Sequence, residues 1–339
     1  IEHIRQRPGM YIERLGNGSH PEDGIYILLK EVIDNSIDEF MEGNGSKIIV
    51  TLDGQKCTVR DYGRGIPLNK LIECVSVINT GAKYDNEAFQ YSVGLNGVGT
   101  KAVNALSSYF EITSWREGEY MNAVFERGEL VHKEKGKGEE PNGTFVSFIP
   151  DDDPAIFGKY TYNEDYIKER LWNYAYLNKG LTITFNGKTI KSAGGLMDLV
   201  KKILGDDGLY PLINYKSRNL EFSFTHTNGY GESYHSYVNG QYTSDGGTHE
   251  AAFKEGVLKG INEYFHKSWA APEIRDGIVA TVAIKVMNPV FESQTKNKLG
   301  NTDVRAWIVP EVKAAVIDVL MKNKEIAKGL EDKILSNEK

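Results

Sequence analysis

Hydrophobic and polar positions along the 339-residue chain follow helical and strand periods in turn. The longest amphipathic helical pattern covers residues 24–43, and a hairpin pattern that turns at Asp53-Gly54 follows it. In the first half, helices are predicted over residues 24–43, 68–79, 99–108 and 163–178, and strands over 47–53, 56–61, 109–115, 120–127, 129–134, 143–149 and 181–191. The charged segment 134–141 is expected to be a hairpin loop.

In the second half, strands alternate with long helices. Helices are predicted over residues 195–204, 249–265 and 303–322, and strands over 220–227, 233–239 and 278–287. Near Ala193 a strand pattern gives way to a glycine pair, which suggests a domain boundary. We therefore expect an α+β chain: residues 1–193 place helices on a mixed, mostly antiparallel sheet, and residues 194–339 form an α/β domain with a βαβ crossover.

Composition narrows the class of protein. Glycine is in excess, at 35 residues, and 40% of residues are hydrophobic, so the chain can bury substantial cores. A net charge of −7 argues against a protein that coats nucleic acid over most of its surface. No apolar run reaches the roughly 18 residues of a membrane span, and the two cysteines, Cys57 and Cys74, favour a reducing cytosol over a disulfide or zinc framework.

The predicted helix over residues 24–43 carries an uncommon polar stripe. At about 100° per residue, Glu31, Asn35, Asp38 and Glu42 share one side of it. An ordinary solvated face is one interpretation. However, no Lys or Arg in the stripe pairs with the carboxylates. A carboxylate one turn from an amide oxygen suits polarising a water and binding a hard cation such as Mg²⁺.

Two glycine loops indicate a nucleotide. After a predicted strand, Asp61 can accept a hydrogen bond from an exocyclic amine, while Gly63 and Gly65 let a flat ligand approach the backbone; a mere tight connection is the alternative. Glycines in segment 93–101 lead into an apolar helix, as phosphate-binding amides do. No compact hydrophobic strand precedes them and no Walker A pattern occurs, so neither a Rossmann turn nor a P-loop fits. An ATP site of another architecture remains.

Three motifs in order resemble the GHKL-type ATP-binding fold shared by gyrase, the Hsp90 chaperone, histidine kinases and the MutL repair protein. They are Glu31…Asn35…Asp38, Asp61-x-Gly63-x-Gly65 and Gly94-x-x-Gly97-x-Gly99. Segments 7–12, 31–35, 245–249 and 293–296 further resemble motifs of the B subunit of bacterial type IIA DNA topoisomerases, with the topoisomerase IV branch favoured over the gyrase branch. The resemblance spans essentially the whole chain and implies an ATPase domain followed by a transducer domain.

The resemblance implies roles for individual residues. Glu31 would be the general base, Asn35 would bind Mg²⁺, and Asp61 would accept from the adenine amine beside Thr144. Gln294 and Lys296 would act at the γ-phosphate as catalytic residues from the second domain. The other residues implied to bind the nucleotide are Gly63, Arg64, Gly65, Ile66, Pro67, Lys83, Gly94, Leu95, Asn96, Gly97, Val98 and Gly99. Arg64 would pair with Glu39, and Arg116 would flank the mouth of the pocket.

The resemblance also implies partners and a setting. We expect a bacterial cytoplasmic protein that binds ATP and Mg²⁺, forms a homodimer on ATP binding, and works with a DNA duplex and the topoisomerase A subunit in an A2B2 enzyme. The chain would be an N-terminal fragment without the DNA-cleavage domain. Lys254, Lys259 and Lys267 are candidates to meet DNA phosphates. Alternatives are a nucleotide-gated clamp or chaperone of the MutL or Hsp90 type, or a catalytically silent DNA-binding module.

The chain departs from the family pattern near the base and in the glycine loop, where Val93 and Asn96 stand in place of Gly and His. Many bacterial relatives have a His one turn before the base, where this chain has Ile27. Another group is therefore expected to orient Glu31.

Overall fold

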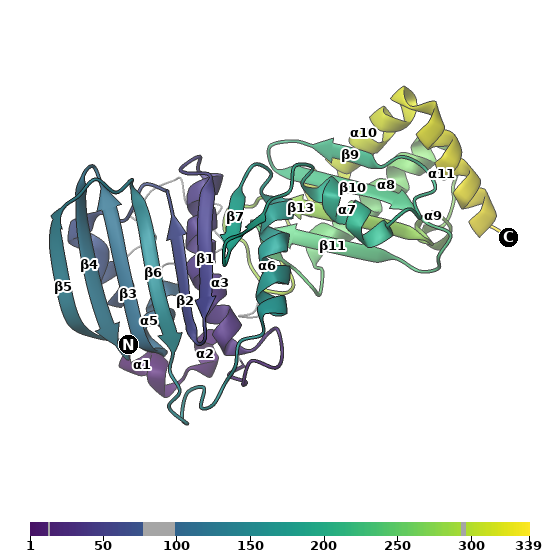
Figure 1. Ribbon diagram of the computed structural model, residues 1–339. Coiled ribbons are helices and arrows are strands. Elements are labelled where there is room, and N and C mark those ends of the chain that lie inside the picture. The colour runs from purple at the N-terminus through teal and green to yellow at the C-terminus, as the bar shows by residue number, and fades with distance from the viewer. Residues whose placement is uncertain (13, 77–98, 293–295) are drawn as a thin grey trace. The chain divides into compact units, whose positions relative to one another are not determined.

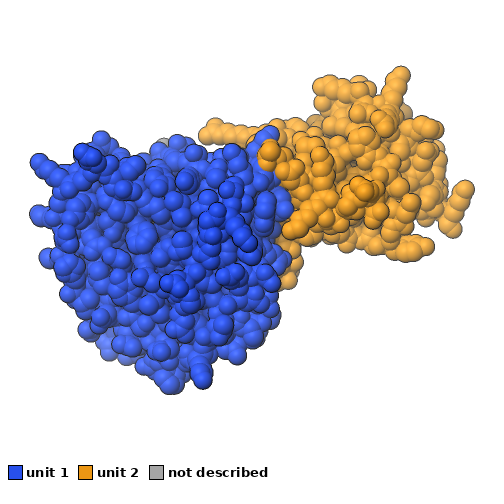
Figure 2. Space-filling view, in the orientation of Figure 1, with its two compact units in different colours: residues 1–192 blue, residues 193–339 orange. Residues whose placement is uncertain are grey.

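The computed structural model describes residues 1–12, 14–76, 99–292 and 296–339. Within these ranges the chain divides into two compact units, Ile1–Ser192 and Ala193–Lys339, which have different colours in Figure 2. Each unit buries an apolar core of its own.

The first unit is built on an eight-stranded sheet with the order β5-β4-β3-β6-β2-β1-β7-β8 (Figure 1). All neighbours in this sheet pair antiparallel except β1 and β7, which are parallel. Its strands are β1 (Lys47–Asp53), β2 (Lys56–Asp61), β3 (Ser107–Arg116), β4 (Glu119–Glu126), β5 (Glu129–Lys137), β6 (Gly143–Pro150), β7 (Thr182–Phe185) and β8 (Lys188–Ile190). The hairpin expected at Asp53-Gly54 joins β1 to β2 and places Asp61 at the end of β2.

Helices α3 and α5 pack on the sheet and on each other (Figure 1). The apolar side of α3 is fully buried against the core, as its periodic Ile, Leu and Val positions predict. Asn163 caps α6, because its side chain accepts from the backbone of Asp165. The helices of this unit are α1 (Glu2–Gln6), α2 (Gly9–Ile12), α3 (Gly24–Met41), the 3-10 turn η1 (Leu68–Lys70), α4 (Leu71–Ser76), α5 (Gly99–Ala105) and α6 (Glu164–Leu177).

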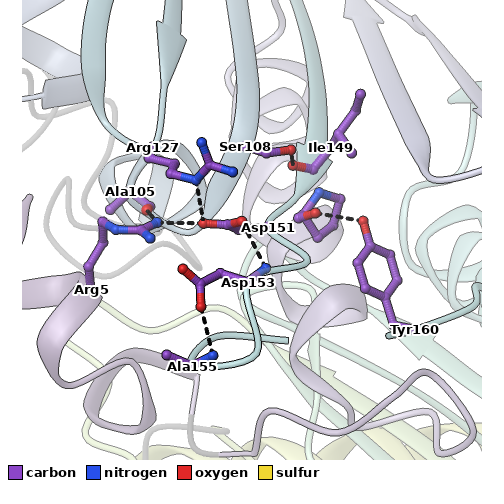
Figure 3. A network of polar contacts seen from close by, with 10 residues as sticks. Arg5, Ala105, Ser108, Arg127, Ile149, Asp151, Asp153, Ala155 and Tyr160 are labelled. Atoms are coloured by element: carbon purple, nitrogen blue, oxygen red, sulfur yellow. Dashed lines mark hydrogen bonds and ion pairs between the residues drawn. The ribbon is translucent and has the colours of Figure 1, made fainter. Parts of the chain in front are cut away.

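A buried carboxylate joins the start of the chain to this unit. Asp151, fully buried at the end of β6, accepts from Arg5 Nη1 at 2.8 Å and from Arg127 Nε at 3.2 Å (Figure 3). Arg5 Nη1 also donates to the carbonyl of Ala105, at the C-terminal end of α5 (Figure 3). These bonds hold helix α1 against the C-terminal end of α5. The N-terminal end of α5 lies in the candidate site described below.

The second unit contains a five-stranded sheet with the order β12-β11-β13-β10-β9. Strands β11 and β13 are parallel and are connected through α8, which is the expected βαβ crossover. Its elements are α7 (Leu196–Leu204), β9 (Ile213–Lys216), β10 (Leu220–His226), β11 (Ser233–Val238), β12 (Gln241–Tyr242), α8 (Thr248–Phe265), α9 (Ala271–Arg275), β13 (Ile278–Ile284), α10 (Arg305–Lys322) and α11 (Lys324–Asn337). Among the described helices of the chain, none has the length and apolar character of a membrane span.

The observed elements differ from the predicted ones mainly where they are short or polar. Elements α1, α2, β9, β12, α9 and α11 were not predicted. Strand β5 continues to Lys137, into the segment expected to be a loop. The sequence did not predict this extension, because an exposed edge strand shows no alternation of apolar and polar residues. Segment 181–191 is a hairpin of β7 and β8 and not one continuous strand.

Candidate active site

Asp61 is the centre of a buried hydrogen-bond cluster. Its Oδ2 accepts from the hydroxyls of Ser36, at 2.7 Å, and Thr144, at 2.6 Å. Its Oδ1 accepts from the backbone amides of Gly63, at 3.0 Å, and Thr144, at 3.2 Å. Four donors fix the carboxylate, which is 4% exposed, in one orientation. The structure thus brings together Asp61, Gly63 and Thr144, and adds Ser36, which the sequence pattern had placed on the apolar side of its helix.

The glycine turn after Asp61 is tightly packed. A Cβ on Gly65, whose φ is +80°, would lie 2.6 Å from the carbonyl oxygen of Trp115 and 2.9 Å from Cγ of Arg116. Arg116 therefore lies beside this turn. A Cβ on Gly63 would lie 2.8 Å from the side chain of Glu39. Close contacts favour glycine at both positions, and the positive φ of Gly65 adds a conformational requirement there.

Polar contacts hold the turn from two sides. Arg64 forms the expected ion pair with Glu39, with Nε–Oε2 and Nη2–Oε1 distances of 3.1 Å. Ser114 Oγ, on β3, accepts from the amide of Ile66 and donates to its carbonyl, both at 2.7 Å. Pro67 then begins the connection to η1. Ser114 was not predicted, because a Ser within a strand pattern gives no signal of a cross-chain contact.

Arg60, the residue before Asp61, was also missed. Its guanidinium lies 4.1 Å from the Tyr62 ring centre and 4.3 Å from that of Trp115. It donates to the carbonyls of Pro141, at 2.8 Å, and of Asp61. This buried cation fastens the segment before Thr144 to the end of β2.

Glu31 and Asn35, the first two residues of the polar stripe, lie against the start of α5. Glu31 is 8% exposed and Asp38 is 2% exposed, so a solvated face is the wrong interpretation of these two residues. A Cβ built on Gly99 would lie 2.2 Å from Glu31 Oε2, which means that the carboxylate rests against the backbone of Gly99. Asn35 Nδ2 donates to Thr100 Oγ1 at 2.7 Å. The first turn of α5 thus contacts Glu31 and Asn35, the two residues expected to activate water and to bind Mg²⁺.

A second buried polar group lies on the same helix. Lys30 Nζ donates to Asp34 Oδ2 at 2.6 Å, and the hydroxyl of Tyr174, on α6, donates to Asp34 Oδ1 at 2.5 Å. Burial, followed by the charge of Asp34, raises the pKa of the Tyr174 hydroxyl well above its ordinary value. Tyr174 is therefore a neutral donor at physiological pH. Ile27 is an apolar core residue, and the Glu31 carboxylate lies against the backbone of Gly99.

Asn35 is the residue in this part of the site that fits a hard cation. Its amide nitrogen is used by Thr100, which orients the carbonyl oxygen Oδ1 as the atom available to a metal. The described residues contain no group of three or more His, Cys, Asp or Glu that could hold a metal ion. This is compatible with Mg²⁺, which commonly takes one or two protein oxygens and completes its shell with phosphates and water.

Other predicted residues lie elsewhere or outside the described ranges. Lys83, Gly94, Leu95, Asn96, Gly97, Val98 and Gln294 lie outside the described residues. Lys296 belongs to the second unit, where it is buried and has a φ of +59°. On α8, Lys254 pairs with Glu250 at 3.6 Å and Lys259 with Glu255 at 3.1 Å, while Lys267 follows the helix. Those carboxylates offset part of the positive charge expected to meet DNA.

A buried, hydrogen-bonded carboxylate beside a glycine turn and a second carboxylate at a helix start agree with the class of GHKL-type ATPases. The family model described as "Histidine kinase-, DNA gyrase B-, and HSP90-like ATPase" matches residues 20–154. The model described as DNA gyrase B matches residues 165–339, and the chain belongs to the DNA gyrase B family.

Individual relatives agree with this assignment. The B subunit of DNA topoisomerase 4 from Borreliella burgdorferi is 52% identical over all of this chain and 56% of its own length. The B subunit of DNA gyrase from Thermotoga maritima is 36% identical over 99% of this chain and 58% of its own length. The chain thus spans a little over half the length of these relatives.

Solved structures share the fold. The 43K ATPase domain of Thermus thermophilus gyrase B, solved with an aminocoumarin, has a TM-score of 0.81 at 30% identity, covering 99% of this chain and 93% of that one. The topoisomerase IV ATP-binding domain of Francisella tularensis, solved with a small-molecule inhibitor, has a TM-score of 0.76 at 26% identity, covering 99% and 96%. The expected family and α+β fold class are confirmed, and the MutL-like or Hsp90-like alternative is not favoured.

Proposed function

We propose that this chain is the ATP-binding and ATP-hydrolysing module of a type IIA DNA topoisomerase, from the B subunit of a topoisomerase IV. The observation that carries the proposal is the contact of the Glu31 carboxylate with Gly99, at the first residue of α5. A buried carboxylate at this helix start would act as the base beside the phosphates, which we propose are bound there. The higher identity to the Borreliella topoisomerase 4 protein than to the Thermotoga gyrase protein supports the topoisomerase IV branch.

The Asp61 cluster fits an adenine. Its carboxylate is oriented by Ser36, Gly63 and Thr144, and its acceptor oxygens suit the exocyclic amine of the base. Guanine presents a carbonyl at the equivalent position, which would face the carboxylate unfavourably. We therefore assign adenine recognition to Asp61 with Thr144 beside it, and add Ser36 as the residue that orients the acid. Gly63, Arg64, Gly65, Ile66 and Pro67 would form the adjoining wall.

The residues around the start of α5 fit water activation. Glu31 would orient and deprotonate the attacking water, and the surrounding low-dielectric protein would make this base effective. Asn35 would hold Mg²⁺ through Oδ1. When bound, the cation would offset charge on the phosphates. The hydrogen bond from Asn35 to Thr100 would orient the side chain for this role.

The remaining predicted residues complete the nucleotide site in this proposal. Segment 94–99 would wrap the phosphates with its amides, and Lys83 would lie at the start of that lid. Gln294 and Lys296 would contact the γ-phosphate from the second unit. The state of the nucleotide would then change the geometry between the two units.

Dimerisation and partner binding belong to the whole enzyme in this proposal. Dimer closure on ATP binding would capture a DNA duplex, and the topoisomerase A subunit would complete an A2B2 enzyme. We place this enzyme in the bacterial cytoplasm.

Hydrolysis by Glu31→Gln tests the proposal. The substitution keeps the size of the side chain and removes the base, so we expect nucleotide binding within about twofold of wild type and turnover reduced by about 100-fold or more. Binding of a non-hydrolysable ATP analogue is measured by calorimetry and turnover by phosphate release.

Glu42→Gln, on the same side of α3 but at its end, is the matched control and should retain turnover. A wild-type chain that binds but never hydrolyses ATP, or a Glu31→Gln variant with normal turnover, contradicts the proposed function.

A further inference from the structure

The glycine motif at residues 245–249 is joined directly to the segment after Lys296. Three backbone hydrogen bonds connect the two: Asp245 N–H to the carbonyl of Asn297 at 2.9 Å, Leu299 N–H to that of Gly246 at 3.2 Å, and Thr248 N–H to that of Leu299 at 3.1 Å. Gly247 and Leu299 form a parallel bridge. Helix α8 begins at Thr248, so these bonds tie the segment to the start of an 18-residue helix.

Gly247 is required by the closeness of this contact. Its φ is +132°, and a Cβ would lie 2.5 Å from both the backbone nitrogen and the carbonyl oxygen of Leu299. Backbone atoms paired on two sides cannot move aside easily. At Gly246, by contrast, a Cβ would meet the carboxylate of Glu250 at 2.6 Å, which a flexible side chain can relieve by turning. Gly247 is therefore the position that no other residue can fill without displacing Leu299.

The same segment is also fastened on its other side. The amide of Glu292 donates to the carbonyl of Lys298 at 3.0 Å, and the amide of Gly300 donates to that of Val290 at 2.7 Å. Phe291 and Leu299 form an antiparallel bridge. Residues 297–300 are thus held between two backbone neighbours, one of which is the glycine motif.

Lys296 directly precedes this held segment. Its φ of +59° is in the left-handed region, and its side chain is only 2% exposed. A residue other than glycine keeps such a conformation only when its surroundings over-determine it. Here the surroundings include the bonded pair of Asp245 and Asn297, one residue further along the chain.

We propose that Gly247 is a positioning residue for Lys296. By allowing Leu299 to pair with the start of α8, it fixes the backbone from which the Lys296 side chain extends. The inference rests on the proposed function, in which Lys296 acts at the γ-phosphate. A displacement of about 1 Å at such a group can cost about 100-fold in rate.

The kinetic test compares Gly247→Ala with Gly300→Ala. A Cβ at Gly300 would lie 3.5 Å from the carbonyl of Val290, an ordinary contact, so this variant alters the same segment without forcing it apart. For Gly247→Ala we expect kcat to fall about 10- to 100-fold, with the affinity for a non-hydrolysable ATP analogue within about twofold of wild type. Gly300→Ala should keep both values. Wild-type kcat in Gly247→Ala overturns the inference.

A structural readout tests the same inference without turnover. Hydrogen exchange of residues 290–300 should be faster in Gly247→Ala and unchanged in Gly300→Ala, while exchange in the first unit stays as in wild type. Thr248→Pro is a second variant in case Gly247→Ala does not fold. Proline is tolerated at the first residue of a helix, and here it removes the amide that donates to Leu299.

The two proposals can fail separately. If the wild-type chain does not hydrolyse ATP, or if Lys296→Ala has normal turnover, the proposed function of Lys296 fails, and hydrogen exchange still decides whether Gly247 holds the segment. If Lys296→Ala loses turnover while Gly247→Ala has wild-type exchange and turnover, the positioning role of Gly247 is wrong.

Discussion

The hydroxyl of Thr144, on β6, donates a 2.6 Å hydrogen bond to Oδ2 of Asp61, on β2, across 83 residues of sequence. Antiparallel pairing of the two strands puts these residues at the same end of the sheet. The amide of Thr144 donates to the other carboxylate oxygen, so one residue orients both oxygens of the acid. A carboxylate fixed in this way can discriminate between nucleobases.

This geometry predicts that the Thr144 hydroxyl contributes to nucleotide affinity. Thr144→Val keeps the shape of the side chain but removes one of the four donors to Asp61, and it places an apolar group beside a buried charge. We expect the affinity for an ATP analogue to fall about tenfold, the equivalent of one hydrogen bond to a charged group. Calorimetric titration measures it.

Thr144→Ser is the control, because it retains the hydroxyl and should bind nearly as tightly as wild type. If the Val and Ser variants bind equally well, the hydroxyl has no part in recognition and the selectivity assigned to the cluster needs another source.

A second prediction concerns the contact between α3 and α5. Gly99→Ala would place a methyl group 2.2 Å from Glu31 Oε2, and the carboxylate must then turn away. We expect turnover to fall at least about tenfold while the thermal stability changes little, because the side chain that moves is flexible. Gly9→Ala, where a Cβ would meet nothing within 4 Å, is the matched glycine control. Normal turnover in Gly99→Ala would show that the orientation of Glu31 does not limit hydrolysis.

A third prediction concerns the buried charge at Asp151. Arg5→Ala should destabilise the first unit more than Arg127→Ala, since the Arg5 side chain is 21% exposed and also bonds α5, whereas that of Arg127 is 50% exposed. Asp151→Ala leaves two guanidinium groups without their carboxylate and should lower the free energy of unfolding by about 3 kcal/mol. Arg127→Ala should lower it by about 1 kcal/mol or less. Urea unfolding followed by tryptophan fluorescence ranks the three variants. An equal loss in the two arginine variants would contradict the role given to the Ala105 contact.

Much of this architecture could be predicted from the sequence, for identifiable reasons. Long amphipathic patterns and the Asp53-Gly54 turn gave the positions of the main helices and of the β1–β2 hairpin. Asp61, Gly63 and Asn35 stood out because their residue types are unusual in strands or in a helix interior. The sequence therefore indicated the chemistry of the site before any contact was known.

The partners of these residues could not be predicted, because long-range contacts leave no local pattern. In the sequence, Ser36 is a small residue on an apolar helix face. Only the tertiary structure shows that Asp61, at the end of β2, lies next to it. Ser114 and Arg60 act through the β3–β6–β2 register, which single-strand periodicity does not reveal. The short helix α1 depends on tertiary contacts such as that of Arg5 with Asp151, because so short a segment is not stable by its own propensity.

The last prediction is a pH dependence of the second unit. Burial lowers the pKa of His226 from 6.5 to about 4. Its Nε2–H donates to the carbonyl of Ile274 at 2.7 Å, so Nδ1 accepts from the hydroxyl of Tyr210, and the folded unit holds the ring neutral. Burial also lowers the pKa of His249, to about 3.

Below pH 6.5 these histidines bind protons in the unfolded chain but stay neutral in the folded unit. The free energy of unfolding is therefore at its full value above pH 6.5 and decreases as the pH falls toward 4. Each histidine contributes a slope of about 1.4 kcal/mol per pH unit in this window. Replacing His226 with Gln should lower stability at pH 7 and reduce the slope between pH 6 and 5 by about 1.4 kcal/mol per pH unit. The remaining slope comes partly from His249 and His235, because burial lowers the pKa of both. Urea titrations at pH 7, 6 and 5 measure the slope. Parallel pH dependences in wild type and His226→Gln would show that His226 does not control the acid sensitivity of this unit.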